Sequence, residues 1–357
     1  MPPLPKVCIS ILNWNRLPDT LACLESVFNL DYPNFEVIVV DNHSSESPEE
    51  TIRRLHPGAK LIINRANIGF TGGNNVAMAY AMQSGADYIW LLNNDTVVEP
   101  NSLRRLVEYA EANDSIGLVS PLIYYLDDMD RMQFAGSRVD WRNLRLTYPS
   151  ESGDNGSFQE GEDVCLWGTA LLVRRRVVEK VGYLNEDYFA YWEDTEYSLR
   201  SLRNGFRNAV CTSAKIYHDL DSNQLQTGGR KPHFYYFMCR NRLLLGHEYL
   251  RGVKARFEFL RQFLATMLCT LGLCHRNGNV ENTGAVLNGA WHGLRSLSGP
   301  MTSKDQMPNA LRRFFLLLAR GQPFLLANVI MLDWRAIAGQ FSRLRARLRE
   351  SAASKLS

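Results

Sequence analysis

The sequence lacks a long uninterrupted hydrophobic run. None of its 357 residues falls in a stretch of the roughly 18 consecutive apolar residues that a membrane-spanning helix needs. The nearest segment, Phe263 to Cys274, is too short, and Phe314 to Leu332 is interrupted by a charged residue and a proline. The first residues show no charged segment followed by an apolar one, so no secretory signal is predicted. We therefore expect a protein that is soluble or that lies on a membrane surface.

Paired cysteine motifs and a strong charge of one sign are also missing. The seven cysteines are scattered and none forms a C-x-x-C pair, which favours reduced thiols in a cytoplasmic compartment over a zinc site or a disulfide framework. A net charge of +3 is too small to indicate a nucleic-acid partner. The length allows one large α/β domain with an appended segment, or two domains.

Short apolar runs alternate with helical segments over the first 125 residues. Runs of this kind without polar alternation are typical of strands buried on both faces, and their alternation with helices predicts a mostly parallel sheet flanked by helices. The predicted strands are Val7–Leu12, Val37–Val40, Leu61–Ile63, Tyr88–Leu92 and Gly117–Val119, with helices at Pro18–Leu30, Pro48–Leu55, Gly73–Ser84 and Asn101–Asn113. Later strands are expected at Val164–Val173 and Ser213–His218, and a helix within Glu186–Asn204.

The chain after residue 233 is helical, aromatic and basic in character. We expect a catalytic domain over residues 1–233 and a helical, basic and apolar region over residues 234–357 that contacts a membrane surface or a second copy of the chain. Within that region Phe341 to Arg349 alternates arginines with apolar residues, which suits either an amphipathic helix on an anionic membrane or a helix packed on its own domain.

Polar residues follow four of the predicted strands. These clusters are Asn13-Trp14-Asn15, Asp41 to Ser45, Asn64 to Asn75 and Asn93-Asn94-Asp95. The carboxyl ends of parallel strands share one edge of a sheet, and ligands of such sheets bind there. A fold that needed only solubility would rarely place four such clusters on one edge, so the sequence predicts a binding site.

Each cluster has a ligand-binding interpretation and a purely structural one. Asp41 could accept a base imide or a ribose hydroxyl, or it could form an Asx turn. The segment from Asn67 through Gly69, Gly73 and Asn74 could approach a phosphate at a helix N-terminus, or it could be a tight turn. Asp95 could ligate Mg2+ or Mn2+ on a diphosphate, which its position favours over helix capping.

A second acidic group lies about a hundred residues further on. Glu193 and Asp194 follow aromatic residues at the start of a predicted helix, where low hydration and neighbouring charge suit a general base. The helix dipole alone could also explain acids there. His218 ends a short strand and could complete the metal site of Asp95, although a lone histidine is more often structural.

These motifs resemble glycosyltransferase family 2, the inverting enzymes of the GT-A fold, and in particular its rhamnosyltransferase-like bacterial branch. The resemblance spans residues 7 to 250. It lies in Ile11–Asn15, Val40–Ser45, Asn67–Asn74, Leu92–Asp95, Gly168–Arg175, Phe189–Asp194 and the later Arg240-Asn241-Arg242. It implies a Rossmann-like sheet with a helical C-terminal extension.

The resemblance also implies residue roles. The donor, a dTDP- or UDP-sugar, would be held by Asn13, Trp14, Asn15, Asp41, Asn67, Gly69, Gly73, Asn74, Asn93, Asn94, Asp95, Trp167, Gly168 and Thr169. Asp95 and His218 would hold the divalent cation, Mg2+ or Mn2+, and Asp194, beside Glu193, would be the catalytic base. Asn93 stands where the family's D-x-D element has its first aspartate, which weakens the expected metal affinity.

The predicted reaction is transfer of a sugar, with L-rhamnose preferred, to a cell-surface glycan or lipid-linked saccharide at the cytoplasmic face of the membrane. A sugar nucleotidyltransferase is the alternative, but Asn13 to Arg16 stands where its triphosphate loop should be. A catalytically decayed carbohydrate-binding protein is a third possibility, which the retained acidic residues disfavour.

Overall fold

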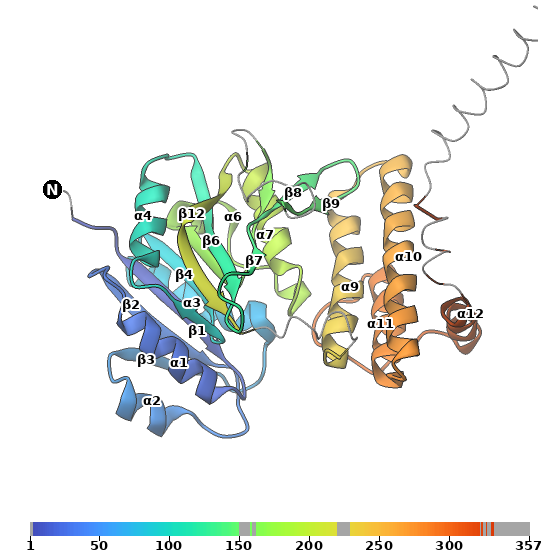
Figure 1. Ribbon diagram of the computed structural model, residues 1–357, viewed down its shortest axis with the longest axis horizontal. Helices are drawn as coiled ribbons and strands as arrows, with labels where there is room; N and C mark the ends of the chain where they lie inside the picture. Colours follow the sequence, from blue (N-terminus) through green and yellow to red (C-terminus); the bar gives the residue numbers. More distant parts are fainter. Residues whose placement is uncertain are drawn as a thin grey trace, which may run out of the picture.

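The computed structural model describes residues 3–149, 158, 162–219, 229–321, 323, 326 and 330–331. A sheet with helices on both faces occupies one side of the molecule, and a group of long helices, α9, α10 and α11, stands beside it (Figure 1). The predicted helix at Phe341 to Arg349 lies outside the described residues.

The sheet region contains most of the predicted elements. Its strands are β1 (Val7–Asn13), β2 (Phe35–Asp41), β3 (Ala59–Ile63), β4 (Tyr88–Asn93), β5 (Thr96–Val98), β6 (Ile116–Tyr125), β7 (Met132–Phe134), β8 (Ser137–Asp140), β9 (Arg145–Thr147), β10 (Val164–Cys165), β11 (Ala170–Arg174) and β12 (Arg207–His218). Its helices are α1 (Leu17–Phe28), α2 (Glu49–Leu55), α3 (Gly69–Gln83), α4 (Ser102–Glu111), α6 (Arg175–Val181), the 3-10 turn η1 (Glu186–Tyr188) and α7 (Glu193–Arg203).

The strands of the main sheet run in the order β3-β2-β1-β4-β11-β6-β12-β5, with β7 paired to β6. The pairs β3-β2, β2-β1, β1-β4 and β6-β12 are parallel, as the alternating pattern predicts. β11 is antiparallel to both β4 and β6, and β5 is antiparallel to β12. A small second sheet joins β10, β8 and β9.

Alternate residues of each strand enter opposite cores. On one face Ile9 and Ile11 pack with side chains of α1, α2 and α4. On the other face Ile38 and Val40 pack with α3, α6 and α7. Burial on both faces explains why these strands are continuously apolar.

Two predicted strands differ from the observed ones. The run Val164–Val173 is divided into β10 and β11, because residues 166–169 leave the strand conformation before the chain reverses direction beside β4. β12 begins at Arg207, earlier than the predicted Ser213, and a register shift between Cys211 and Lys215 interrupts its pairing. β12 begins with the polar residues Arg207 and Asn208, which an apolar pattern does not predict as a strand.

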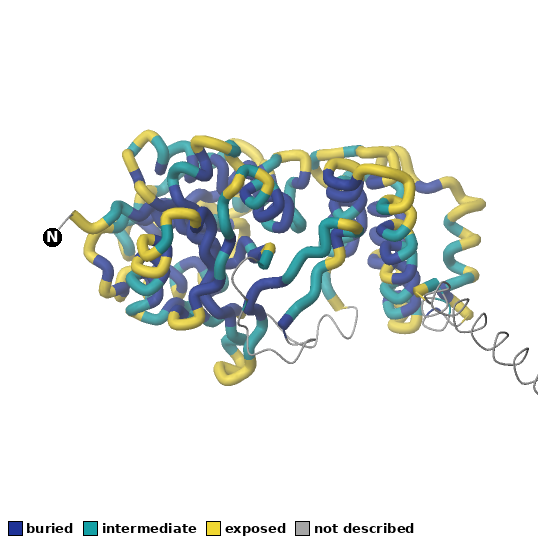
Figure 2. Tube along the Cα trace, turned by 90° about the horizontal axis from the view of Figure 1, so that it is seen from above, coloured by how far each residue is buried: buried dark blue, intermediate teal, exposed yellow. Residues whose placement is uncertain are grey.

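The helical region consists of α9 (Pro232–Tyr249), α10 (Val253–Arg276), α11 (Val280–Leu294) and α12 (Asn309–Arg320). Its apolar core is continuous with Tyr188 of η1 and Leu199 of α7. Figure 2 shows buried residues running from the sheet into these helices, whereas α12 is largely exposed.

Within the described residues, α10 is the one helix long and apolar enough to span a membrane by length and composition. Half of its most apolar 18-residue window is buried inside the protein. Packing against α9, α11 and α12 therefore accounts for its hydrophobicity without a bilayer. All seven cysteines are free thiols.

Candidate active site

The register of the parallel strands brings the polar clusters to one edge of the sheet. Asn13 is paired with Asp41, and Leu12 is paired with Asn93. The residues that follow β1, β2 and β4 therefore lie side by side, as the sequence predicts for this edge.

Asp41 lies in a buried hydrogen-bond network. Its Oδ1 accepts hydrogen bonds from Asn13 Nδ2 at 2.7 Å and from the Ser44 hydroxyl at 2.6 Å, and its Oδ2 accepts from the Ser44 backbone N–H at 3.0 Å. Asn15 accepts hydrogen bonds from Ser45, while Trp14 is exposed beside them. The Asx turn at Asp41 is thus present, and contact with a nucleotide base stays a prediction.

Asn67 is joined to the neighbouring strand end through Asn42. Asn42 Nδ2 donates to Asn67 Oδ1 at 3.0 Å and to the Gly69 carbonyl at 2.9 Å, and Asn67 Oδ1 also accepts from the Gly69 N–H at 2.9 Å. These bonds fix the turn that leads into α3. Gly69 has φ +82, a backbone conformation that glycine adopts without strain.

Gly73 and Asn74 face the protein interior. A Cβ on Gly73 would collide with Leu12. Asn74 accepts a hydrogen bond from the Ser10 hydroxyl at 3.0 Å and donates to the Phe70 carbonyl at 3.0 Å. These contacts explain both residues by packing of α3 on β1, so their predicted contact with the donor gains no support from the structure.

Asp95 and His218 lie together because β5 pairs with the end of β12. His218 is opposite Thr96 in that pairing, and its Nε2 is 3.2 Å from Asp95 Oδ1. The other ring nitrogen, Nδ1, is 2.8 Å from Gln133 Oε1 on β7. Asn94 lies beside them and donates to the Thr20 hydroxyl at 2.9 Å.

The charge environment of Asp95 favours its ionised form. Burial acts to raise the pKa of Asp95, but His218 and the guanidinium of Arg16 outweigh it and hold the pKa below its ordinary value. Arg16 Nη1 is 4.0 Å from Asp95 Oδ2. Neither Arg16 nor Gln133 belongs to the sequence-predicted site, because neither lies in an acidic or apolar motif.

The pair of Asp95 and His218 fits a divalent cation. A protonated His218 donates its Nε2–H toward the buried Asp95 Oδ1, 3.2 Å away, whereas a neutral His218 that donates Nδ1–H to Gln133 turns an Nε2 lone pair to the same oxygen. A proton or a metal ion is needed between two such acceptors. Among the described residues no group of three or more His, Cys, Asp or Glu side chains could hold a metal, so the protein supplies few ligands here.

The start of α7 is tied to the segment between β10 and β11. The Gly168 N–H donates to Asp194 Oδ2 at 2.9 Å, and the Thr195 N–H donates to Asp194 Oδ1 at 2.6 Å. Trp167 stacks on Phe134 with ring centroids 4.0 Å apart. Gly168, one of the residues predicted to hold the donor, thus lies directly against the predicted base.

Glu193 and Asp194 differ in surroundings. Burial raises the pKa of both carboxyl groups, and the negative charge of Asp194 raises that of Glu193 further. The N–H groups of Gly168 and Thr195 oppose the rise at Asp194. Glu193 is buried with Oε2 unpartnered, whereas Asp194 is partly exposed, so Asp194 is the better placed to meet a substrate.

The two acidic clusters belong to one neighbourhood. The Asn93 N–H donates to the Thr169 carbonyl at 2.9 Å, next to the Gly168 that binds Asp194. The pKa of Tyr191 is raised first by burial and then by both Glu193 and Asp95, so its phenol senses both clusters. The structure therefore brings together residues a hundred positions apart.

The loop between η1 and α7 is backbone-strained. Phe189, Tyr191 and Trp192 have φ of 61, 66 and 69, values that bulky residues rarely adopt. Each such residue costs about 1–3 kcal/mol and persists only where surrounding contacts enforce it. Arg240 and Asn241 of α9 make those contacts, a role that the sequence motif alone did not reveal.

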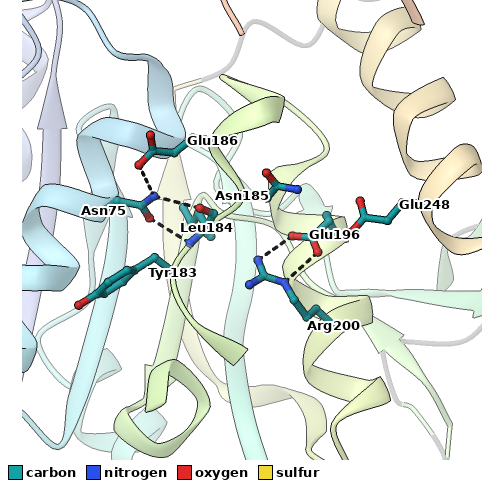
Figure 3. A pocket seen from close by; sticks show the side chains of 8 residues that line it. All are labelled: Asn75, Tyr183, Leu184, Asn185, Glu186, Glu196, Arg200 and Glu248. Atoms are coloured by element: carbon teal, nitrogen blue, oxygen red, sulfur yellow. Dashed lines mark hydrogen bonds and ion pairs between the residues drawn. The ribbon is translucent and has the colours of Figure 1, made fainter. Parts of the chain in front are cut away.

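A separate polar cavity of 460 Å3 opens on another side of α7 (Figure 3). Figure 3 shows Glu196 paired with Arg200, and Asn75 bonded to Glu186 and Leu184. Of the predicted polar clusters only Asn75, the last residue of Asn64 to Asn75, lines it, and none of the residues predicted to hold the donor, the cation or the acceptor proton does. The cavity is therefore not part of the Asp95–Asp194 site.

Comparison with known proteins decides the family. The family model for Glycosyl transferase family 2 matches residues 8–182, which contain the clusters of β1, β2 and β4. The chain belongs to glycosyl transferase family 2. It is a glycosyltransferase by that domain and by its similarity to characterised members, as the sequence motifs predict.

Three relatives illustrate the range of this glycosyltransferase family. The galactofuranosyltransferase GlfT1 of Mycolicibacterium smegmatis is 27% identical over 71% of this chain and 87% of its own length. The hexosyltransferase Agl10 of Haloferax volcanii is 22% identical over 74% and 84%. The dTDP-rhamnosyl transferase RfbF of Shigella flexneri is 21% identical over 61% and 73%.

Solved structures confirm the GT-A fold. A mannosyltransferase from Pyrobaculum calidifontis in complex with GDP-Man and Mn2+ matches with a TM-score of 0.53 at 15% identity, covering 92% of this chain and 87% of that one. TarS of S. aureus, residues 1–349, matches with a TM-score of 0.51 at 15% identity, covering 93% and 91%. The mannosyltransferase structure and a structure of GalNAc-T7 with UDP and GalNAc both contain Mn2+.

Proposed function

We propose that this glycosyltransferase moves a hexose from a nucleoside-diphosphate sugar to a hydroxyl group of a cell-surface glycan or lipid-linked saccharide, with inversion at the anomeric carbon. The observation that carries the proposal is the hydrogen bond from Gly168 to Asp194. It joins a partly exposed carboxyl of raised pKa to the sheet edge that holds Asp95.

In the proposed reaction, Asp194 takes the proton of the acceptor hydroxyl. The acceptor oxygen forms a bond to the anomeric carbon as the bond from that carbon to the diphosphate oxygen breaks, and the nucleoside diphosphate leaves with the electron pair. The raised pKa of Asp194 makes it a stronger base than an exposed aspartate, while Gly168 and Thr195 hold its oxygens in position.

Asp95 and His218 would hold the cation, Mg2+ or Mn2+. Once bound, a divalent cation neutralises charge on the departing diphosphate. The lowered pKa of Asp95 keeps its carboxylate available as a ligand across the neutral pH range. Asn13 and Asp41, at the ends of β1 and β2, and Asn67, in the turn before α3, would border the nucleoside.

For the donor, we propose dTDP-L-rhamnose first and a galactofuranose nucleotide second. The family branch that the motifs resemble and the similarity to RfbF support the first, and the similarity to GlfT1 supports the second. Both sugars suit a transfer in the assembly of a cell-envelope polysaccharide.

The test is a thermal-shift screen of nucleotide sugars with and without Mn2+, followed by an assay of nucleoside-diphosphate release. We expect one donor to raise the unfolding temperature more in Mn2+ than in EDTA, and slow release of the diphosphate from that donor. Release of pyrophosphate from a nucleoside triphosphate and a sugar phosphate would instead establish a nucleotidyltransferase. Binding without any turnover would establish a carbohydrate-binding protein.

We also propose that α10 begins at a membrane surface, at the inner face of the cell membrane. Val253 is 87% exposed, Phe257 68% and Leu260 41%, and this spacing places them along one side of the helix. Arg251, Lys254 and Arg256 are exposed around them. Apolar side chains ringed by cations suit the headgroup region of an anionic bilayer.

Vesicle flotation tests this surface. The full-length protein should bind vesicles that contain phosphatidylglycerol and bind phosphatidylcholine vesicles much less. Phe257→Ser with Leu260→Ser should reduce binding about tenfold or more, since each apolar side chain contributes roughly 1.5–3 kcal/mol when fully buried. Phe314→Ser, an exposed residue on α12, is the matched control. Equal binding of the double variant and the wild type, or dimer formation that the double variant abolishes, would contradict the membrane assignment.

A further inference from the structure

The loop that precedes the proposed catalytic base has no glycine to relieve its strained backbone. Residues 189–192 read Phe-Ala-Tyr-Trp, and three of these four residues have positive φ. The loop leads directly into α7, whose first two residues are Glu193 and Asp194. Something outside the loop must therefore hold it in place.

We infer that Arg240 and Asn241 of α9 are positioning residues for catalysis, because they hold the main chain of this loop and thereby set the location of Asp194. The inference rests on the proposed function of Asp194. It assigns to the helical region a part in the reaction, separate from substrate binding and from packing.

Asn241 provides the central contacts. Its Nδ2 group lies 2.8 Å from the carbonyl oxygen of Tyr188, 2.8 Å from that of Ala190 and 2.7 Å from that of Tyr191. The two N–H bonds of one amide group are thus shared among three carbonyl oxygens of the four-residue stretch 188–191. Asn241 is fully buried, so water cannot replace these bonds if its side chain is removed.

Arg240 extends the same set of bonds. Its Nη2 donates to the carbonyl oxygens of Asp187 at 3.0 Å and Tyr188 at 2.8 Å, and its Nη1 donates to that of Gly299. Its Nε donates to Asn241 Oδ1 at 2.7 Å, which fixes the orientation of the amide. The guanidinium is fully buried, and backbone oxygens rather than a carboxylate receive its N–H groups.

The opposite side of the loop is fixed by α3. The Phe189 carbonyl accepts from the Thr71 N–H at 3.2 Å and from the Thr71 hydroxyl at 3.4 Å. Gly69 of the same helix lies against the Phe189 carbonyl and ring. The loop is therefore held between the donor-side helix α3 and the helical region, and loosening either contact would shift Asp194 relative to Gly168.

The test compares Asn241→Leu, which keeps the side-chain shape but removes every donor, with Tyr236→Phe. Tyr236→Phe removes a buried hydroxyl, which bonds His292 at 2.7 Å, from the same helix; it keeps the ring that lies beside Arg240 and leaves every loop carbonyl oxygen with its partner. Nucleoside-diphosphate release is measured in the full-length proteins, together with hydrogen exchange of the peptide that contains residues 186–194. A third variant is Arg240→Lys, which keeps the positive charge but replaces the planar guanidinium and its several N–H donors with a single ammonium group.

For Asn241→Leu we expect kcat to fall about 10- to 100-fold, as for a reacting group displaced by about 1 Å, while KM for the donor changes less than about twofold. Amides of the 186–194 peptide should exchange faster. Arg240→Lys should lie between wild type and Asn241→Leu, and Tyr236→Phe should match wild type in kcat and in exchange of this peptide.

Three results would overturn the inference. They are unchanged exchange in Asn241→Leu, unchanged kcat despite faster exchange, and an equal loss of kcat in Tyr236→Phe. If Asn241→Leu does not fold, Arg240→Lys decides by the same measurements. If the wild type transfers no sugar, the proposed function fails by itself, and hydrogen exchange still decides whether α9 holds the loop.

Discussion

Opposing influences meet at single side chains in the candidate site. At Asp194 burial raises the pKa while two backbone N–H groups lower it, and at Asp95 burial is outweighed by His218 and Arg16. One carboxyl is therefore adjusted to take a proton and the other to remain an anion. Such a division between two acids of one site is common in enzymes that combine base catalysis with charge neutralisation.

Asp194→Asn should abolish turnover while leaving donor binding nearly unchanged. The amide keeps the shape of the side chain and one acceptor for the Gly168 N–H, but it cannot accept a proton from the acceptor. We expect kcat to fall by at least about 100-fold, with the donor-induced thermal shift within a degree of wild type. A variant that retains the normal rate would remove Asp194 from the role of base.

Glu193→Gln should stabilise the protein at neutral pH. The folded-state pKa of Glu193 lies well above the ordinary value because of burial and the charge of Asp194. Stability from this group is therefore fully present below the ordinary glutamate pKa of about 4.3 and is lost as pH rises through the raised value.

Chemical denaturation at a series of pH values measures this effect. The stability gain of Glu193→Gln should be at least about 1 kcal/mol at pH 7.5 and shrink toward zero near pH 4, because one pKa unit corresponds to about 1.4 kcal/mol. Glu46→Gln, at an exposed position, should show no such trend. A gain independent of pH would contradict the electrostatic explanation.

At the scale of elements, the apolar strands and the residues at their carboxyl ends could be predicted from the sequence. A strand such as β2 is buried on both faces, so its residues form a continuous apolar run in the sequence. Parallel pairing with β1 then places Asn13 beside Asp41. The antiparallel β11 could not be predicted, because its direction depends on partners β4 and β6 rather than on its own residues.

The strained backbone of the loop before α7 also could not be predicted from the sequence. Nothing in Phe189 to Trp192 favours positive φ, and the bonds that enforce it come from Asn241, fifty residues later. The glycines of α3 were predicted either to approach a phosphate or to form a tight turn; Gly73 lies against Leu12, and the phosphate contact stays a prediction. A sequence shows where a glycine is present, but it does not show which neighbouring group leaves no room for a side chain there.

Gly69→Ala should destabilise the junction between α3 and the loop. Alanine at φ +82 is strained, and its Cβ would overlap the Phe189 carbonyl. Gly85→Ala is the matched control, since Gly85 has φ +74 but open space around it. We expect about 1–2 kcal/mol for the control and a larger loss for Gly69→Ala, measured by denaturant unfolding. Equal losses would mean that the close contact with Phe189 has no energetic weight.

At the scale of the whole molecule, the predicted boundary near residue 233 divides a shared core. Tyr188 and Leu199 of the sheet region belong to the same apolar cluster as Phe237 and Leu243 of α9. The order of elements supports a division at that point, but the packing does not. We therefore expect the two regions to unfold together.

A protein ending at residue 233 should not fold to the native state. It would expose Tyr188 and Leu199 and leave the carbonyl oxygens that Arg240 and Asn241 bond without partners. Thermal unfolding followed by circular dichroism should show no cooperative transition, whereas the full-length protein shows one. A cooperative transition in the shortened protein, with donor binding intact, would establish residues 1–233 as an independent domain.

The Nδ2 group of Asn241 bonds only backbone carbonyl oxygens, which every amino acid possesses. These bonds do not depend on which side chains the loop carries, whereas the packing of Phe189 on Phe237 and of Tyr191 on Phe234 does. Substitution of Tyr191 or its neighbours can change which molecule binds near Asp194 while the backbone conformation of the loop is kept. Descendants of this enzyme could in this way change acceptors by few substitutions, and libraries built at these positions offer a practical route to new glycan linkages.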